Sequence, residues 1–223
     1  MERYRRTISL IGNEANNRLI NSKVIIFGVG GVGSYAAEAI ARSGVGEITI
    51  VDGDTVAKSN INRQLVALTS TVGRSKAEVA AERLADINPD AKITAVNEFY
   101  KPGSNLDIKK YDFVVDAIDD VEAKIELIKN AIEQGIPVIS SMGAAGKFDT
   151  SFKVADIAKT SVCPLAKVMR KRLREIGIEH LPVVYSEEKP VKCENELGTM
   201  SYVPGACGLV LASYVIRKLA GIE

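Results

Sequence analysis

The segment between Asp52 and Gln64 holds the densest group of side chains that could do chemistry. It combines carboxylates, amides and a guanidinium, at Asp52, Asp54, Asn60, Asn62, Arg63 and Gln64. A guanidinium is a planar fork for phosphate oxygens, and carboxylate oxygens are ligands that Mg²⁺ prefers. This set therefore suits a triphosphate with its metal ion. A hydride-transfer enzyme has no evident need for it at this place.

A glycine-rich turn precedes this segment and predicts a phosphate site. Its glycines are Gly28, Gly30, Gly31 and Gly33. They follow a β-branched run at 24–27 that predicts a buried strand, and an alanine-rich run at 34–42 that predicts a helix comes next. Such a turn brings backbone N–H groups close to a phosphate, and the helix N-terminus adds positive partial charge. Asp52 ends a second predicted strand, about 20 residues past the glycines, where an acid binds a ribose hydroxyl in this architecture.

Strands and helices alternate along the rest of the chain. The pattern predicts strands at 93–96, 113–117 and 136–140, and helices at 13–22, 73–88 and 122–134. This alternation indicates an α/β fold: a doubly wound, Rossmann-like, mostly parallel sheet with a small C-terminal α/β extension. Because ligands lie beyond the carboxyl ends of such strands, Gly28, Asp52 and Asp119 should meet at one edge of the sheet. Whether Asp116 or Asp119 faces a metal ion stays open.

Composition limits the classes of function. The 223 residues carry a formal net charge of +1, so global charge gives no reason to expect a DNA partner. No run reaches the roughly 18 apolar residues that a membrane span needs, and the N-terminus does not resemble a signal peptide. Three widely spaced cysteines, Cys163, Cys193 and Cys207, favour a reducing cytosol and leave their roles open. The sole histidine, His180, argues against a histidine-based catalytic triad.

The glycine turn, the Asp52-x-Asp54 pair, the run from Ser59 to Gln64 and a downstream Gly73-x-x-Lys76 resemble the ThiF/MoeB superfamily of adenylating enzymes. This superfamily includes the ubiquitin-activating enzymes. The resemblance implies ATP and Mg²⁺ as cofactors. It implies that Asp52 binds the adenosine ribose and that the phosphates are held by Asn60, Arg63 and Lys76.

The same resemblance implies a metal ligand and an oligomer. Asp119 matches the family's carboxylate near Mg²⁺ and the acyl phosphate, and Arg6 matches an arginine that family dimers insert into the partner's ATP site. A homodimer is therefore expected. We expect one adenylating domain over the whole chain, with a helical arm at 1–22, a nucleotide-binding core at 23–150 and a substrate and dimer extension at 151–223.

Cysteine spacing separates members of this superfamily. Many relatives that activate sulfur carriers bind a structural zinc ion through two Cys-x-x-Cys pairs, and this chain has no such pair, so no structural zinc is expected. Relatives that form a thioester place a cysteine in the crossover after the sheet. Here the crossover between Ser140 and Ser161 has none, and small residues at 142–147 stand over the expected adenylate.

A run of cations at 165–174 predicts a basic amphipathic helix, with apolar residues at 165, 168, 169 and 173. The helix is either a solvated surface or a patch for RNA phosphates. With Asp156–Thr160 and Pro164-Leu165, it resembles the tRNA threonylcarbamoyladenosine dehydratase branch of the family. That resemblance implies a cytoplasmic enzyme that adenylates the threonyl carboxylate of threonylcarbamoyladenosine in tRNA. Cyclodehydration would follow, with release of AMP and pyrophosphate.

Other functions remain open on the sequence. The chain could instead adenylate the C-terminal glycine of a ubiquitin-like sulfur-carrier protein, and a sulfur-transfer protein could be a partner. A nucleotide-binding scaffold without catalytic activity is a further alternative. An inactive site, however, need not keep Asn60, Arg63, Lys76 and Asp119 together. An NAD-dependent oxidoreductase is more distant.

Overall fold

The computed structural model describes residues 2–191 and 197–222 of the chain. Its centre is a seven-stranded sheet in the order β3-β2-β1-β4-β5-β7-β6, in which β6 runs antiparallel to β7 and the other neighbours are parallel. The strands are β1 (Lys23–Phe27), β2 (Glu47–Val51), β3 (Lys92–Val96), β4 (Phe113–Asp116), β5 (Val138–Ser141), β6 (Lys153–Asp156) and β7 (Pro182–Tyr185). The strand order changes direction between β1 and β4, which is where ligands bind in open α/β sheets. The predicted doubly wound α/β fold is confirmed.

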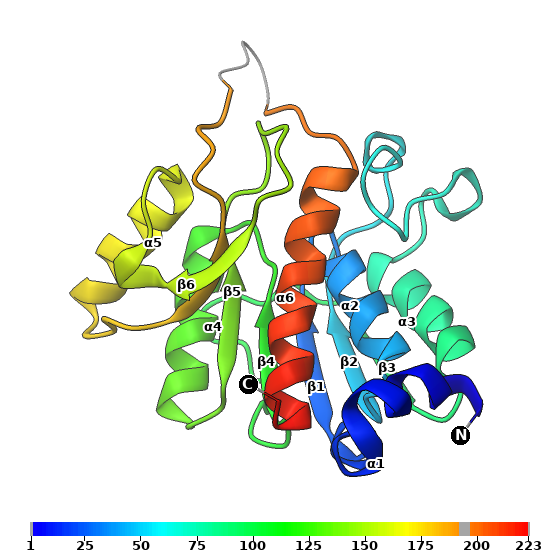
Figure 1. Cartoon of the computed structure of the whole chain (residues 1–223). Coiled ribbons are helices and arrows are strands. Elements are labelled where there is room, and N and C mark those ends of the chain that lie inside the picture. The colour runs from blue at the N-terminus through cyan, green and yellow to red at the C-terminus, as the bar shows by residue number, and fades with distance from the viewer. Residues whose placement is uncertain (1, 192–196, 223) are drawn as a thin grey trace.

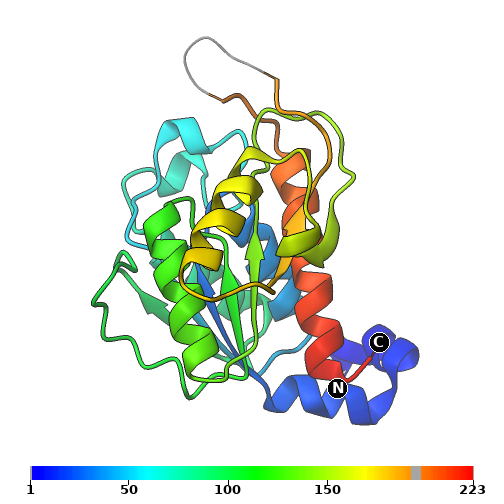
Figure 2. The ribbon, with the colours of Figure 1, turned by 90° about the vertical axis from the view of Figure 1, so that its left-hand side faces the viewer.

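Helices cover both faces of this sheet (Figures 1 and 2). One face carries α1 (Arg5–Asn21), α2 (Gly33–Arg42), α3 (Lys76–Ile87) and α6 (Tyr202–Ala220), and the other carries α4 (Val121–Glu133) and α5 (Pro164–Glu175). Side chains alternate along β1: Val24 and Ile26 pack in the first hydrophobic core, and Ile25 and Phe27 pack in the second. Because both faces of β1 are buried, its sequence is a continuous apolar run.

Two helices begin several residues away from the predicted positions. The N-terminal helix begins at Arg5 and bends at Gly12, where φ is 80°, whereas the sequence predicted a helix from residue 13 only. The missed first half is mostly exposed, so it lacks the apolar period on which the prediction depended. The third helix begins at Lys76, later than predicted, because the hydroxyl of Ser75 caps it by accepting from the backbone N–H of Glu78 at 3.4 Å.

The C-terminal part of the chain continues the same sheet. Both β6 and β7 join it beyond β5, and α6 returns across the first face to pack against α2 and α1 (Figure 1). Among the described residues, α6 alone is long and apolar enough to cross a membrane by length and composition, a result that the sequence analysis did not anticipate. Half of that stretch is buried within the protein, as expected for a core helix.

Candidate active site

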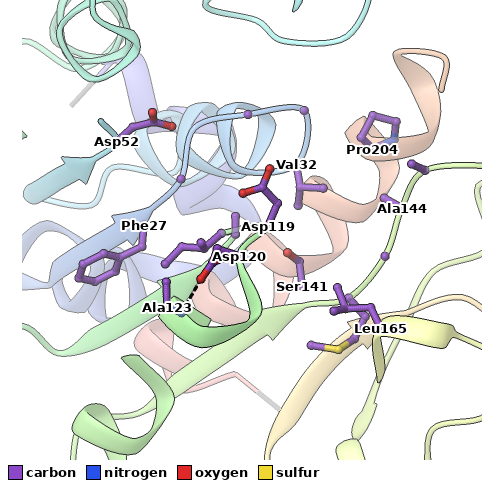
Figure 3. Close-up of a pocket in the computed structure, with 18 of the residues that line it drawn as sticks. Phe27, Val32, Asp52, Asp119, Asp120, Ala123, Ser141, Ala144, Leu165 and Pro204 are labelled. Atoms are coloured by element: carbon purple, nitrogen blue, oxygen red, sulfur yellow. Dashed lines mark hydrogen bonds between the residues drawn. The ribbon is translucent and has the colours of Figure 1, made fainter. Parts of the chain in front are cut away.

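A cavity of about 780 Å³ opens beyond the carboxyl ends of β1, β2, β4 and β5 (Figure 3). It brings together most of the residues singled out in the sequence: Gly28, Gly30, Gly31, Asp52, Asp54, Arg63, Gln64, Lys76 and Asp119. Four other predicted site residues do not line it: Arg6, Gly33, Asn60 and Asn62. The edge of the sheet predicted for the site is therefore the edge that carries this cavity.

The glycines of the turn have different surroundings. Gly28 has a φ of 84°, and a Cβ there would lie 2.6 Å from the carbonyl oxygen of Ala117. Gly33 begins α2, and a Cβ on it would lie only 1.8 Å from the carbonyl oxygen of Gly28. A Cβ on Gly30 would meet nothing nearer than the Gln64 amide nitrogen at 3.7 Å. Gly28 and Gly33 are thus needed for the fold, whereas Gly30 leaves backbone open toward the cavity.

Asp52 ties the second strand to the glycine turn. One of its carboxylate oxygens accepts from the N–H of Val29 at 2.8 Å, and the other accepts from the N–H of Asp54 at 2.9 Å. Burial raises the pKa of Asp52 above its ordinary value, and the two N–H groups and the nearby charge of Lys76 oppose that rise. The carboxylate is therefore fixed at the cavity wall, within the turn that the glycines form.

The polar loop after β2 divides into shaping and lining residues. The Asn60 side-chain oxygen accepts from the N–H of Ala57 at 3.0 Å, and the Asn62 amide donates to the carbonyl of Thr199 at 3.1 Å. These two amides hold the loop in place and lie outside the cavity. The Arg63 guanidinium lines the cavity and donates to the Asn62 side-chain oxygen at 2.8 Å.

Lys76 and Gln64 present buried polar groups to the cavity. The Lys76 ammonium is 2.8 Å from the Asp54 carboxylate, and Lys76 is only 6% exposed although Asp54 is open to solvent. The side-chain oxygen of Gln64 is buried and has no hydrogen-bond partner among the described residues. A buried cation and an unpaired buried acceptor at one cavity wall are the groups that a polar ligand would contact.

Asp116 and Asp119 have different surroundings in the structure. Asp116 is fully buried, lies 2.9 Å from the Lys124 ammonium and accepts from the Ser140 hydroxyl at 2.6 Å, so it faces no cavity. Asp119 is exposed in the cavity, and its side chain makes no hydrogen bond or ion pair with the described residues (Figure 3). Asp120 caps α4 by accepting from the N–H of Ala123 at 2.8 Å. Of these three carboxylates, only Asp119 lines the cavity with both oxygens unpaired among the described residues; Asp120 also lines the cavity, with one oxygen engaged in the cap.

Sequence reasoning missed one wall of the cavity, the segment 98–101 after β3. Phe99 lies over Gly53, where a Cβ would come within 2.6 Å of the phenyl ring, and Tyr100 meets Phe27 edge to face at 4.9 Å between ring centroids. The signal was present, because an aromatic pair follows a strand end on the ligand side of the sheet. The sequence analysis made no prediction for that stretch.

The ThiF family model matches residues 4–223. The chain belongs to the ThiF family. It is 41% identical to the tRNA threonylcarbamoyladenosine dehydratase of Bacillus subtilis, over 98% of this chain and 95% of that protein. It is 34% identical to the Escherichia coli protein of the same name, over 98% and 93%. A crystal structure of E. coli TcdA in complex with ATP superposes with a TM-score of 0.92, at 37% identity, covering 99% of this chain and 94% of that one.

The second half of the cavity of this ThiF-family protein is formed by residues 141–145 and by the start of α5. Cys163 lies there, buried and free, and Cys207 is buried in α6. Burial raises the pKa of the Cys207 thiol to about 12. Cys193 lies outside the described residues. No group of three or more histidine, cysteine or acidic side chains that could hold a metal ion occurs among the described residues.

Arg6 is not near the cavity of its own chain. It is exposed on α1, which lies beside the C-terminal end of α6, whereas Pro204 at the start of α6 lines the cavity (Figure 1). Any contact of Arg6 with a nucleotide would therefore require a second copy of the chain. The structure describes one chain, so this part of the prediction stays a prediction.

The predicted basic helix exists as α5, but its apolar face differs from the one predicted. Ala166, Met169 and Leu173 are buried, and Val168 is 45% exposed. Leu165 is partly buried: it lines the cavity and also packs against the second hydrophobic core. The prediction grouped these residues by hydropathy alone, and the direction in which the helix meets the sheet decides which of them are covered.

Proposed function

We propose that this chain is a tRNA threonylcarbamoyladenosine dehydratase. The observation that carries the proposal is the likeness to proteins of that name over 98% of the chain, at up to 41% identity. The likeness therefore includes both halves of the cavity and α5. In this proposal the enzyme uses ATP to activate the threonyl carboxylate of the modified adenosine.

The cavity offers a complete set of groups for ATP. We assign the ribose to Asp52 and the phosphates to the backbone around Gly30, to Arg63 and to Lys76. Binding of E. coli TcdA to ATP and to AMP supports this use of the cavity. On ATP binding, Lys76 would exchange its contact with Asp54 for a phosphate oxygen.

Mg²⁺ fits the remaining carboxylate. Asp119 is exposed in the cavity with no partner among the described residues, and Mg²⁺ is commonly held by one or two carboxylates together with substrate phosphates and water. We therefore assign Asp119 to the metal ion. When bound, the ion would neutralise charge on the phosphates, while Arg63 and Lys76 orient them.

The reaction would take two steps. A threonyl carboxylate oxygen bonds to the α-phosphorus of ATP as the bond from that phosphorus to the bridging oxygen breaks, and pyrophosphate leaves. The carbamoyl oxygen then bonds to the acyl carbon as the bond from that carbon to the phosphate oxygen breaks, so that AMP leaves and the carbamoyl nitrogen loses a proton. The base has lost one water overall. Because the second step is intramolecular, proximity replaces a nucleophile on the enzyme.

One face of α5 suits the tRNA. Lys167, Lys171 and Arg174 are exposed and spaced four and three residues apart, so they form one stripe along the helix. The stripe begins one turn after Pro164, which lines the cavity. Lys171 lies 3.9 Å from Glu175 in an exposed pair, whereas Arg172 is engaged in two hydrogen bonds to Glu122 at 2.7 and 2.8 Å. We propose that the stripe contacts phosphates beside the modified base, and that a homodimer in the cytoplasm completes each ATP site with Arg6.

The test is AMP release from MgATP with tRNA that carries threonylcarbamoyladenosine, compared with the same tRNA lacking the modification. We expect release only with the modified tRNA, together with the mass loss of one water from the modified nucleoside. If neither tRNA stimulates release, this substrate is wrong, and the site would be tested with a ubiquitin-like carrier protein.

The contact between the α5 stripe and tRNA is tested with a triple variant and a matched control variant. Replacing Lys167, Lys171 and Arg174 by glutamine should raise the KM for tRNA. The slope of log KM against log salt concentration should fall by about 0.7 to 0.9 for each lost phosphate contact. Lys109→Gln/Lys110→Gln, exposed near the amino end of β4, should leave both unchanged. Equal effects of the two sets would refute the assignment.

A further inference from the structure

The turn between β4 and α4 is held by a buried ion pair. The Lys124 ammonium lies 2.9 Å from the Asp116 carboxylate, and both side chains are 0% exposed. Lys124 does not line the cavity, so it would contact neither ATP nor the modified adenosine of the tRNA. A fully buried pair carries a desolvation cost that often cancels its attraction, and an apolar pair of similar size is often as stable. The pair can therefore serve the protein through the groups that it positions.

The pair holds both backbone polar groups of one residue, Ile118. The carbonyl of Ile118 accepts from the Lys124 ammonium at 3.0 Å, and the N–H of Ile118 donates to the Asp116 carboxylate at 3.1 Å. Asp116 is itself fixed by the Ser140 hydroxyl at 2.6 Å, which links the turn to β5. Ile118 is thus held through both its backbone N–H and its carbonyl, and Asp119 follows it directly.

Asp119 depends on this anchoring more than a typical carboxylate would. Its side chain has no hydrogen bond or ion pair with any described residue, so only its backbone determines where it lies in the cavity. The backbone is held on one side by Ile118 and on the other by Asp120, which caps α4. In Figure 3, Asp119 extends from this turn into the middle of the cavity.

We infer that Lys124 is a positioning residue for the adenylation step, acting through Asp116 and the Ile118 peptide to place Asp119. The inference rests on the proposed function, because Asp119 is assigned there to the metal ion. A displacement of about 1 Å in a group of this kind can cost on the order of 10²-fold in rate. Lys124 would thus affect catalysis without touching substrate.

The test is a mutant cycle with a charge-neutral replacement of the pair. Asp116→Asn/Lys124→Met removes both charges together, so no unpaired buried charge is left to unfold the chain. Turnover is measured for this pair variant, for Asp119→Asn and for the triple variant. The matched control is Lys129→Met on the same helix, whose partly exposed lysine lies 4.0 Å from Glu133.

We expect the pair variant to lower kcat by about tenfold or more while the KM for ATP changes by less than about threefold, because the ribose and phosphate contacts are untouched. In the Asp119→Asn background the same replacement should change kcat by less than about twofold, since the two sites act as one unit. Equal losses in both backgrounds, or no loss in the first, would refute the inference. Lys129→Met should resemble the wild type.

Hydrogen exchange supplies a readout that needs no substrate. The amides of 117–119 should exchange faster in the pair variant than in the wild type, with α4 beyond Ala123 unchanged, and unchanged exchange at 117–119 would overturn the inference. If the pair variant does not fold, Ser140→Ala removes only the 2.6 Å hydrogen bond and should show the same effects more weakly. A wild type that releases no AMP with modified tRNA while these amides respond would contradict the proposed substrate and leave the positioning role supported.

Discussion

Two glycines three residues apart should respond in opposite ways to the same added methyl group. A Cβ on Gly33 would lie 1.8 Å from the carbonyl oxygen of Gly28, and 3.1 Å from the Cβ of Ala117. Reaching an ordinary contact requires α2 to move by more than about 1 Å away from β1, against a core that is packed to crystal-like density. On Gly30 the added Cβ meets only the Gln64 amide, at 3.7 Å.

The expected costs follow from these distances. Gly33→Ala should destabilise the fold by about 3 kcal/mol or more, which for a chain of this length corresponds to a fall in Tm of roughly 6–12 °C. Gly30→Ala should change the free energy of unfolding by less than about 1 kcal/mol. The same variant should weaken ATP binding by about tenfold or more, because its methyl group stands where the phosphate must approach backbone N–H groups.

Thermal unfolding and ATP titration calorimetry on the two variants separate these effects. Wild-type affinity for ATP in Gly30→Ala would refute the assignment of this turn to the phosphates. A Tm for Gly33→Ala within a degree or two of the wild type would refute the packing argument, since it would mean that α2 can shift without cost. Loss of both thermal stability and ATP affinity in both variants would show that the two glycines do not have separate roles.

The remaining predictions concern the charged residues of the cavity and the buried thiol of α6. Lys76→Met and Arg63→Ala should each abolish AMP formation at near-saturating ATP with circular dichroism unchanged; retained turnover in either would remove that residue from the phosphate site. Because burial raises the pKa of Asp52, ATP affinity should fall on acidification at a pH above the ordinary pKa of aspartate, and Asp52→Asn should bind ATP weakly with no such dependence. With a pKa of about 12, the Cys207 thiol is only ~10⁻⁴ ionised at pH 8, so mass spectrometry after iodoacetamide should find it unmodified in the native protein and alkylated in denaturant.

Local patterns in the sequence were sufficient for the first five strands of the sheet and for its ligand edge, but β6 and β7 were not predicted as strands. The apolar run of β1, the glycine turn and Asp52 are each encoded by residues adjacent in the chain, and parallel strands bring their carboxyl ends to one edge. The roles that depend on distant partners were not accessible in this way. Lys124 occupies a helical position that a solvated lysine could equally fill, and only the folded chain shows it against Asp116.

The same distinction explains the two amides of the polar loop. Asn60 and Asn62 have the residue types of ligand groups, and the family resemblance places Asn60 at the phosphates, yet their side chains bond to the backbone of Ala57 and Thr199. Amide side chains serve turns and ligands with the same hydrogen-bonding groups, so composition alone does not separate the two uses. The structure shows the turn contacts of the two side chains, and the phosphate role of Asn60 stays a prediction.

The second half of the cavity favours a reaction in which the substrate supplies its own nucleophile. Its walls are small or apolar, from Met142 to Ala145 and at Leu165, and no histidine lines it among the described residues. Its cation, Lys147, is 4% exposed and donates to the carbonyl of Glu188, which keeps it in place as a structural charge. An acyl adenylate formed beside such walls would meet small and apolar side chains, and a carbamoyl group carried on the same molecule is already within reach of the acyl carbon. Ring closure with loss of AMP is thus the reaction that this part of the cavity permits with the fewest added groups.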